Sequence, residues 1–349
     1  MTNCSDSQKE TPARSARDSV RTSCAAPRKP REAFGRRPGQ RSHGPSTGFS
    51  ILELAVSLLV LSIIVSGVVY AATNFQKSYG RSSLQTDMYE NVRGVAELME
   101  QEIGQAGLLS LPSTTLSAAI TANATAQAAS VSSTTSMFVG ENLLVDAGST
   151  SEELVAVTAI GTSTFSGIFT KAHASGAPVT VLGVFPNGVV VPGTTDGSTS
   201  VTEPGVSTLN LFGDINADGS LVYVRYTCST SSTPGTLTRS INVITPGVTT
   251  GISNQTLLST LVPNPGGTAC FQYTTATVTV GSTTYTFVTN IGVTLSVRTL
   301  REDPLTGQYL TMTKSFLDMS PRNILAGFEQ ANAGLTNRLQ ATPSNVLSY

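Results

Sequence analysis

The longest apolar run in the chain extends from Phe49 to Ala72 and contains a single acidic or basic side chain, Glu53. As a helix, these residues would extend about 36 Å, which is enough to cross a hydrocarbon core of about 30 Å. The pattern therefore predicts a membrane-spanning helix over 49–72. An acid inside such a span costs roughly 2.5–3.5 kcal/mol on insertion scales. Glu53 thus either serves a purpose within the membrane or lies close enough to the interface to reach water.

The helical pattern continues beyond this apolar run. No proline occurs between Pro45 and Pro112, and Gly104 and Gly107 then provide helix terminators. Apolar residues recur at steps of three and four along one face, and charged residues fill the opposite face. The apolar stripe consists of Leu84, Met88, Val92, Val95, Met99 and Ile103. We therefore expect one helix over 49–107, with its second half docked on a globular head. A membrane anchor followed by a coiled linker is the alternative.

After the helix, the periodicity changes towards two. Residues 108–136 are dominated by Ser, Thr and Ala, which predicts a linker without a core of its own. Short Val, Thr, Ile, Phe and Tyr runs then predict a small β insert over 137–182 and a mostly antiparallel β head over 183–320. Residues 321–349 are expected to form a C-terminal tail that begins with a short helical turn. The fold class is thus α+β, a long helical spine on a β-sheet head.

Charge divides the chain into two different parts. Residues 1–48 carry ten Lys and Arg against four Asp and Glu, which leaves 11 basic and 18 acidic residues in the remainder. The basic part lacks apolar periodicity, so we expect a disordered leader that the positive-inside rule keeps on the cytoplasmic side. A nucleic-acid-binding arm is the competing interpretation. Because no folded basic surface or interleaved aromatic residues accompany the charge, we expect no direct binding of nucleic acid.

A glycine stands directly before the apolar run, in the sequence GFSILEL at residues 48–54. The order Gly48, Phe49 and, four residues later, Glu53 resembles the class III signal of type IV prepilins and pseudopilins. This resemblance implies cleavage after Gly48 by a prepilin peptidase and methylation of the new amino group on Phe49. It also implies that Glu53 pairs with that amino group during assembly. The leader is longer than is usual in the family, and a mis-assigned upstream start codon would explain its length.

Three further features resemble the minor pilins of the PilW type: residues 89–107, the cysteine-bearing β head and the region 293–323. The resemblance implies a pilin-like subunit inserted in the bacterial inner membrane, in contact with its lipid, with a periplasmic head. Its partners would be other pilins and minor pilins. It would prime or cap a type IV pilus that reaches the cell surface, with adhesion as a downstream role. The alternatives are a type II secretion pseudopilin and a membrane-anchored adhesin that does not polymerise.

Four cysteines occur in the chain, and two of them, Cys4 and Cys24, belong to the expected leader. Cys228 and Cys270 remain in a head that would be exported. No C-x-x-C spacing favours zinc, and an oxidising compartment favours a disulfide. Free buried thiols are the alternative.

One loop has the spacing of a calcium site. Asp214, Asn216 and Asp218 stand at positions one, three and five of a D-x-N-x-D-G pattern, and the backbone carbonyl of Ser220 could provide a fourth oxygen ligand. The twelfth position, where an EF-hand needs glutamate, is Arg225, so an EF-hand is excluded. The alternative to calcium is a plain turn, because Asn, Asp and Gly are also the residues that tight turns require.

Catalytic motifs find little support in this sequence. The chain contains no G-x-x-x-x-G-K phosphate loop and no H-E-x-x-H zinc motif. His173 is the only histidine after Gly48, and a lone histidine is usually structural. We therefore expect a structural protein rather than an enzyme, with no cofactor other than the calcium considered above.

Overall fold

A computed structural model describes residues 48–111, 113–191, 206–232, 234–244, 253–343 and 346. The expected leader, apart from Gly48, lies outside these residues. Contacts divide the chain into two units, residues 1–63 and 64–349, with the boundary inside the first helix. Each unit is described by itself.

The first element of the described residues is the helix α1 (Ile51–Gln105), of 55 residues, which confirms the predicted helix to within two residues at each end. Ser50 caps its start, because its side-chain oxygen accepts a hydrogen bond from the backbone N–H of Leu52 at 3.3 Å. Its end is fixed by Gly107, whose φ of +78° suits a helix C-cap. A Cβ atom at this position would also lie 2.9 Å from the backbone oxygen of Phe185. The positive φ and this close approach both favour glycine at the predicted helix end.

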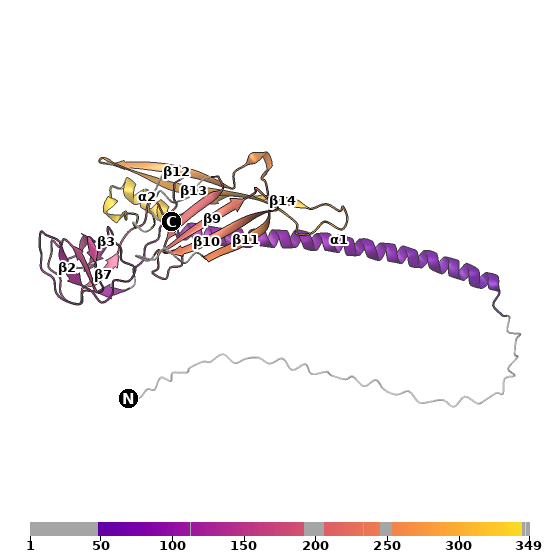
Figure 1. The fold of residues 1–349 in the computed structure, drawn as a ribbon, viewed down its shortest axis with the longest axis horizontal. Helices are drawn as coiled ribbons and strands as arrows, with labels where there is room; N and C mark the ends of the chain where they lie inside the picture. Colours follow the sequence, from indigo (N-terminus) through magenta and orange to yellow (C-terminus); the bar gives the residue numbers. More distant parts are fainter. Residues whose placement is uncertain are drawn as a thin grey trace, which may run out of the picture. The chain divides into compact units, whose positions relative to one another are not determined.

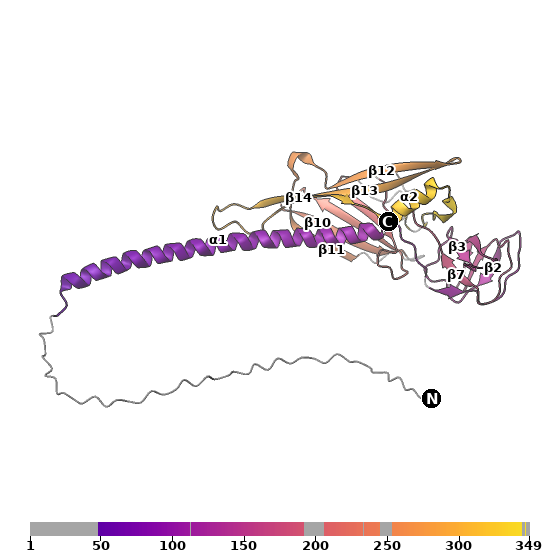
Figure 2. The same ribbon diagram turned by 180° about the vertical axis from the view of Figure 1, so that it is seen from behind.

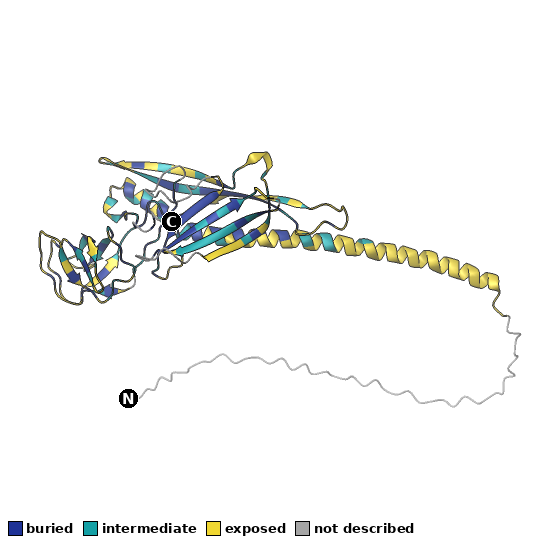
Figure 3. Cartoon of the chain, in the orientation of Figure 1, coloured by how far each residue is buried: buried dark blue, intermediate teal, exposed yellow. Residues whose placement is uncertain are grey.

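Burial on α1 follows the predicted stripe over its second half (Figure 3). The buried residues on this half are Met88, Val92, Val95, Ala96, Met99, Glu102 and Ile103. Leu84, the first member of the stripe, is half-buried. The expectation that charged residues occupy only the opposite face is wrong for Glu102. This residue lies on the buried face, three positions after Met99, and forms an ion pair with Arg239.

The head contains a seven-stranded antiparallel sheet. Six strands follow the order β12-β13-β11-β10-β9-β8, and the seventh, β14, also pairs with β13. Its strands are β8 (Thr208–Gly213), β9 (Val222–Ser229), β10 (Gly235–Val243), β11 (Ser253–Val262), β12 (Phe271–Val280), β13 (Thr283–Arg298) and β14 (Thr311–Met319). The second half of α1 covers one face of this sheet, lying behind it in Figure 1 and in front of it in Figure 2. The largest apolar core lies between them and unites α1 residues with residues of β8 to β14.

The C-terminal segment is more ordered than the predicted tail. It forms α2 (Arg322–Asn332) and a single 3-10 turn, η2 (Thr336–Arg338). Ile324, Ala331 and Leu339 are buried in the core between helix and sheet, so the prediction of a loose tail is wrong for the described residues. These apolar residues are few and widely spaced, which is why the pattern gave only a weak helical signal.

A second β unit precedes the head, and it is larger than the predicted insert. Its strands are β1 (Thr114–Thr115), β2 (Gln127–Ser130), β3 (Asn142–Val145), β4 (Glu153–Ala156), β5 (Ala159–Ile160), β6 (Thr164–Gly167) and β7 (Pro178–Val181). They form a four-stranded sheet, β1-β7-β3-β4, and a three-stranded sheet, β2-β6-β5. Both sheets contribute to one core that includes Phe165 and Val179. We call residues 114–181 the small β unit.

The predicted linker, residues 108–136, is therefore wrong in its central part. Leu116, Ile120 and Val131 are buried in the core of the small β unit, although the residues around them are small or polar. Composition alone suggested too little apolar mass for a core. A few large side chains are enough here because later strands supply the rest of that core.

Specific hydrogen bonds connect the small β unit with the rest of the chain. The side chain of Gln340 accepts from the backbone N–H of Asn142 at 2.9 Å and donates to the carbonyl oxygen of Leu182 at 2.7 Å. The hydroxyl of Ser136 donates to the carbonyl oxygen of Gly219 in the head. Segments far apart in sequence thus meet at this junction.

Candidate functional site

The residues of the expected processing signal lie at the start of α1. Phe49 is 74% exposed, and Glu53 is exposed in the first helical turn. A carboxylate in that turn interacts favourably with the positive end of the helix dipole, by about 0.3–1 kcal/mol at a surface. Local structure therefore accommodates Glu53, but it does not by itself require an acid there.

The first half of α1 exposes a mostly apolar surface. Large apolar side chains from Phe49 to Tyr79 are about half to nearly fully exposed, including Ile51 at 87% and Phe75 at 77%. Within the described residues, α1 is one helix that is long and apolar enough to cross a membrane. Soluble proteins rarely leave contiguous apolar patches of this size uncovered. The helix therefore requires an apolar environment, from lipid or from other helices.

The second half of α1 is fixed to the sheet by a buried polar cluster, Glu102, Tyr226 and Arg239. Tyr226 donates from its hydroxyl to a Glu102 carboxylate oxygen at 2.5 Å, and Arg239 forms a two-point ion pair with the same carboxylate. Tyr226 and Arg239 are directly opposite each other on β9 and β10. One carboxylate on the helix thus meets a cross-strand pair and fixes the axial position of α1 on the sheet.

The environment of this cluster changes how its members titrate. Burial and the negative charge of Glu102 raise the pKa of Tyr226, so its hydroxyl stays protonated and acts as a donor. Burial by itself lowers the pKa of the Arg239 guanidinium. The hydrogen bond and the negative charge of Glu102 raise that pKa by more, so it lies above its ordinary value. The sequence pattern missed this cluster. Its only signal is that Glu102 follows Met99 by three residues and so shares the stripe's face.

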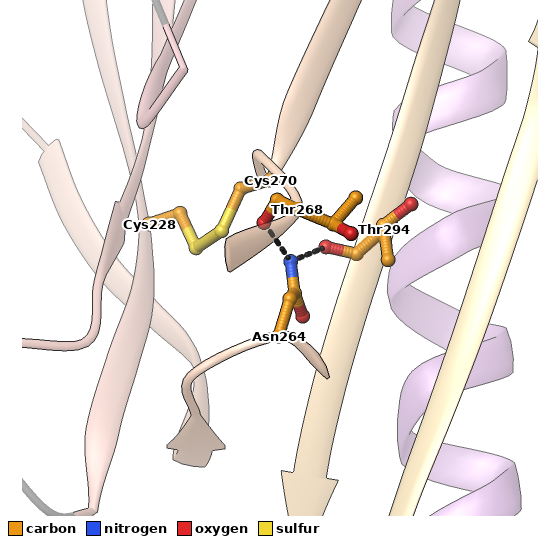
Figure 4. The surroundings of a disulfide bond; sticks show 5 residues. All are labelled: Cys228, Asn264, Thr268, Cys270 and Thr294. Carbon is orange, nitrogen blue, oxygen red and sulfur yellow. Dashed lines mark hydrogen bonds between the residues drawn. A yellow bond between two sulfur atoms is a disulfide. The ribbon is translucent and has the colours of Figure 1, made fainter. Parts of the chain in front are cut away.

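Cys228 and Cys270 form a disulfide, with their Cα atoms 6.5 Å apart (Figure 4). Cys228 belongs to β9, and Cys270 directly precedes β12. The loop that leads to Cys270 contains a 3-10 turn, η1 (Pro265–Gly267), and is also held by Asn264. The Asn264 amide donates to the carbonyl oxygens of Thr268 at 3.0 Å and Thr294 at 2.9 Å. The predicted pairing is confirmed, and it ties the start of β12 to β9, the strand next to β8 in the sheet.

The loop at Asp214 is built as a turn. Its buried carboxylate accepts hydrogen bonds from the backbone N–H groups of Asp218 at 3.0 Å and Gly219 at 2.9 Å, and from the hydroxyl of Ser110. Asn216 and Asp218 are exposed, and the Asp218 carboxylate accepts from the backbone N–H of Ser220 at 2.8 Å.

Both oxygens of Asp214 are therefore engaged with donors. Across the described chain, no group of three or more His, Cys, Asp and Glu side chains could hold a metal ion. The turn alternative accounts for the hydrogen bonds that Asp214 and Asp218 accept, and calcium binding by this loop stays a prediction.

His173 lies in the core of the small β unit. Its side chain is fully buried, with Nε2 at 2.7 Å from an oxygen of Glu153 and Nδ1 at 3.5 Å from an oxygen of Asp146. Its ring packs edge-on against Phe169, with centroids 5.9 Å apart. These contacts join β4 and the residue that follows β3 to the segment before β7. The lone histidine is therefore structural, as the sequence suggested.

No protein-family profile matches this chain, and no characterised protein matches it in sequence. The geometry of the molecule therefore carries the functional argument: a helix with one uncovered apolar half and one half fixed to a β head, preceded by a Gly-Phe junction.

Proposed function

We propose that this chain is a minor-pilin-like structural subunit of a type IV pilus. In this proposal it is inserted in the bacterial inner membrane and cleaved after Gly48 by a prepilin peptidase. It then enters a pilus through its apolar helix, where it primes or caps assembly together with other pilins. The head would lie in the periplasm and afterwards at the cell surface.

The observation that carries the proposal is the combination of the junction and the helix. Gly48, Phe49 and Glu53 stand at the start of α1, whose apolar half is uncovered while its second half is docked. A simple membrane anchor needs no continuous helix into the head. A filament spine does, because the docked half transmits the position of the apolar half to the β head.

Glu53 supplies a physical rule for assembly. Cleavage after Gly48 would create a positive amino group on Phe49 inside an apolar bundle. The carboxylate of Glu53, on the same or a neighbouring subunit, would neutralise it. Removing one partner of a buried ion pair costs about 3–5 kcal/mol, because the other charge is left uncompensated. Only subunits in the correct axial register would avoid that cost.

The experiment is to replace Glu53 by alanine in the producing organism. We expect Glu53→Ala to be inserted and cleaved as the wild type is, since the change makes the span more apolar, but to be reduced at least tenfold in sheared pili. Glu97→Ala, an exposed acid on the docked half of α1, is the matched control and should enter pili normally. Normal incorporation of Glu53→Ala would refute the assembly role. Absence of the wild type from pili, with presence in a secretion complex, would favour the secretion alternative.

A further inference from the structure

The three strands at the margins of the large sheet differ in how their edges are protected. The edge of β8 is covered, because Val190 donates its N–H to the carbonyl of Asn210 at 3.1 Å and Phe212 donates to that of Gly188 at 2.8 Å. β14 carries two charged residues, Lys314 and Asp318, and charge on an edge opposes pairing with another strand.

Beyond Phe271, the third margin, β12, has neither device among the residues that the structure describes. From Phe271 to Val297 the chain contains no charged residue and no proline. β12 is ten residues long and forms the border of the sheet in both Figure 1 and Figure 2. A long, uncharged edge strand is a template for pairing with another extended chain.

The hydrogen bonds of β12 show which of its backbone groups face outward. The carbonyl of Cys270 accepts from Thr294 on β13, whereas the N–H of Phe271 donates away from β13, to Val206 at 3.2 Å. Inward and outward residues alternate along a strand. The register shifts between Thr274 and Thr275, but the extra residue, Thr289, lies on β13. The alternation along β12 itself therefore continues to the hairpin that closes at Val280 and Thr283.

The outward residues of the remaining strand are thus Thr275, Thr277 and Thr279. All three side chains are exposed. By this alternation their backbone N–H and C=O groups point away from β13, and no backbone hydrogen bond outside the β12–β13 ladder reaches them among the described residues. Six backbone groups therefore face the open edge.

We propose that β12 is a dimerisation edge, which pairs antiparallel with β12 of a second copy of this chain. The sequence of the edge is self-complementary. A two-fold axis at Thr277 places Thr277 opposite its own copy and Thr275 opposite Thr279 of the second copy. On the other face, Ala276 meets Val278. Cross-strand threonine pairs stabilise sheets by roughly 0.2–1 kcal/mol each relative to alanine, and no like charges are opposed. This proposal does not depend on the pilus assignment.

Single-cysteine cross-linking tests this register directly. The full chain, with Cys4 and Cys24 replaced by serine, is purified in detergent as Thr277→Cys and oxidised mildly. Hydrogen-bonded antiparallel pairs hold their Cα atoms about 5.5 Å apart, within disulfide range. Gln272→Cys is the matched control, since it is exposed on the same strand but lies ten residue positions from its own copy in this register. We expect at least a tenfold higher dimer yield from Thr277→Cys, and equal yields would overturn the proposal.

A charge placed on the edge provides the second measurement. In the Thr277→Cys background, Thr279→Lys should lower the cross-linked fraction at least tenfold, whereas Gln272→Lys should leave it unchanged. Circular dichroism establishes that each variant is folded. The apolar helix is present in every variant, so association through it affects all of them equally. Cross-linking that survives Thr279→Lys would show random collision and would refute the paired edge.

Discussion

At the scale of single residues, two buried carboxyl groups have opposite surroundings. Glu102 meets Arg239 and Tyr226, so its charge is compensated. Glu141 is fully buried, and one of its oxygens accepts only the N–H of Phe138, at 3.2 Å. The other oxygen has no hydrogen-bond partner within the described residues. The first carboxyl group fixes α1 to the sheet, whereas burial of the second favours its neutral form.

Replacing Glu102 by glutamine should destabilise the head by about 3–5 kcal/mol, because Arg239 would be left buried without its counter-charge. Chemical denaturation of the full chain in detergent measures this change. Glu97→Gln is the control on the same helix, since its ion pair with Arg93 is exposed to solvent and contributes little to stability. Equal effects of the two substitutions would show that the buried cluster does not fix the helix.

Glu141 makes stability depend on pH. Burial raises its pKa to about 8, while the Phe138 hydrogen bond lowers it only in part. Between its ordinary pKa, near 4.5, and about 8, the folded state binds a proton that the unfolded state has released. Stability contributed by this residue therefore falls as the pH rises through that window, by up to about 1.4 kcal/mol per pH unit.

Glu141→Gln should remove this slope and raise the melting temperature at pH 8 relative to the wild type. Thermal unfolding at several values between pH 5 and pH 8 measures both effects. Glu329→Gln, an exposed acid on α2, is the control and should keep the wild-type profile. Parallel profiles for Glu141→Gln and the wild type would contradict a buried neutral carboxyl at this position.

At the scale of elements, α1 was the most predictable part of the chain. A prolonged absence of proline, a regular apolar stripe and a terminal glycine all describe one helix, and such local signals are independent of the rest of the fold. The hairpin from β13 to β14 was predictable for the same reason, since a turn rich in Asp, Pro and Gly separates two alternating runs.

The small β unit was predicted only in part, because its first strands contain few large side chains. Leu116 and Val131 are buried by residues that follow much later in the chain, such as Phe165. Composition within a window cannot reveal such partners. The Glu102 cluster was missed for a related reason: a carboxylate on a helix gives no sign that a tyrosine and an arginine on two strands lie opposite it.

The disulfide is the element-scale feature with the clearest energetic consequence. Cys228 and Cys270 are 42 residues apart, and closing a loop of that length stabilises the folded state by about 4 kcal/mol on the chain-entropy model. The double substitution of both cysteines by serine should therefore lower the free energy of unfolding by about that amount. Peptide mapping without reductant establishes the bond itself. Recovery of both cysteines as alkylated thiols from the untreated wild type would contradict it.

At the scale of the whole molecule, charge and apolar surface are separated along the sequence. The first 48 residues carry a net charge of +6, and the remainder carries −7. The uncovered apolar half of α1 lies directly after the basic part. This order would place the basic residues on one side of a membrane and the acidic remainder on the other. Cleavage at the junction would remove the positive part and leave a helix-led subunit.

The mass of the mature N-terminus, measured on protein purified from the producing organism's membranes, tests the central claim most directly. Our account predicts a chain that begins at a methylated Phe49, and a Gly48→Ala variant that retains all residues before the junction. A wild-type chain that keeps its leader, or that begins at any other residue, would contradict the account.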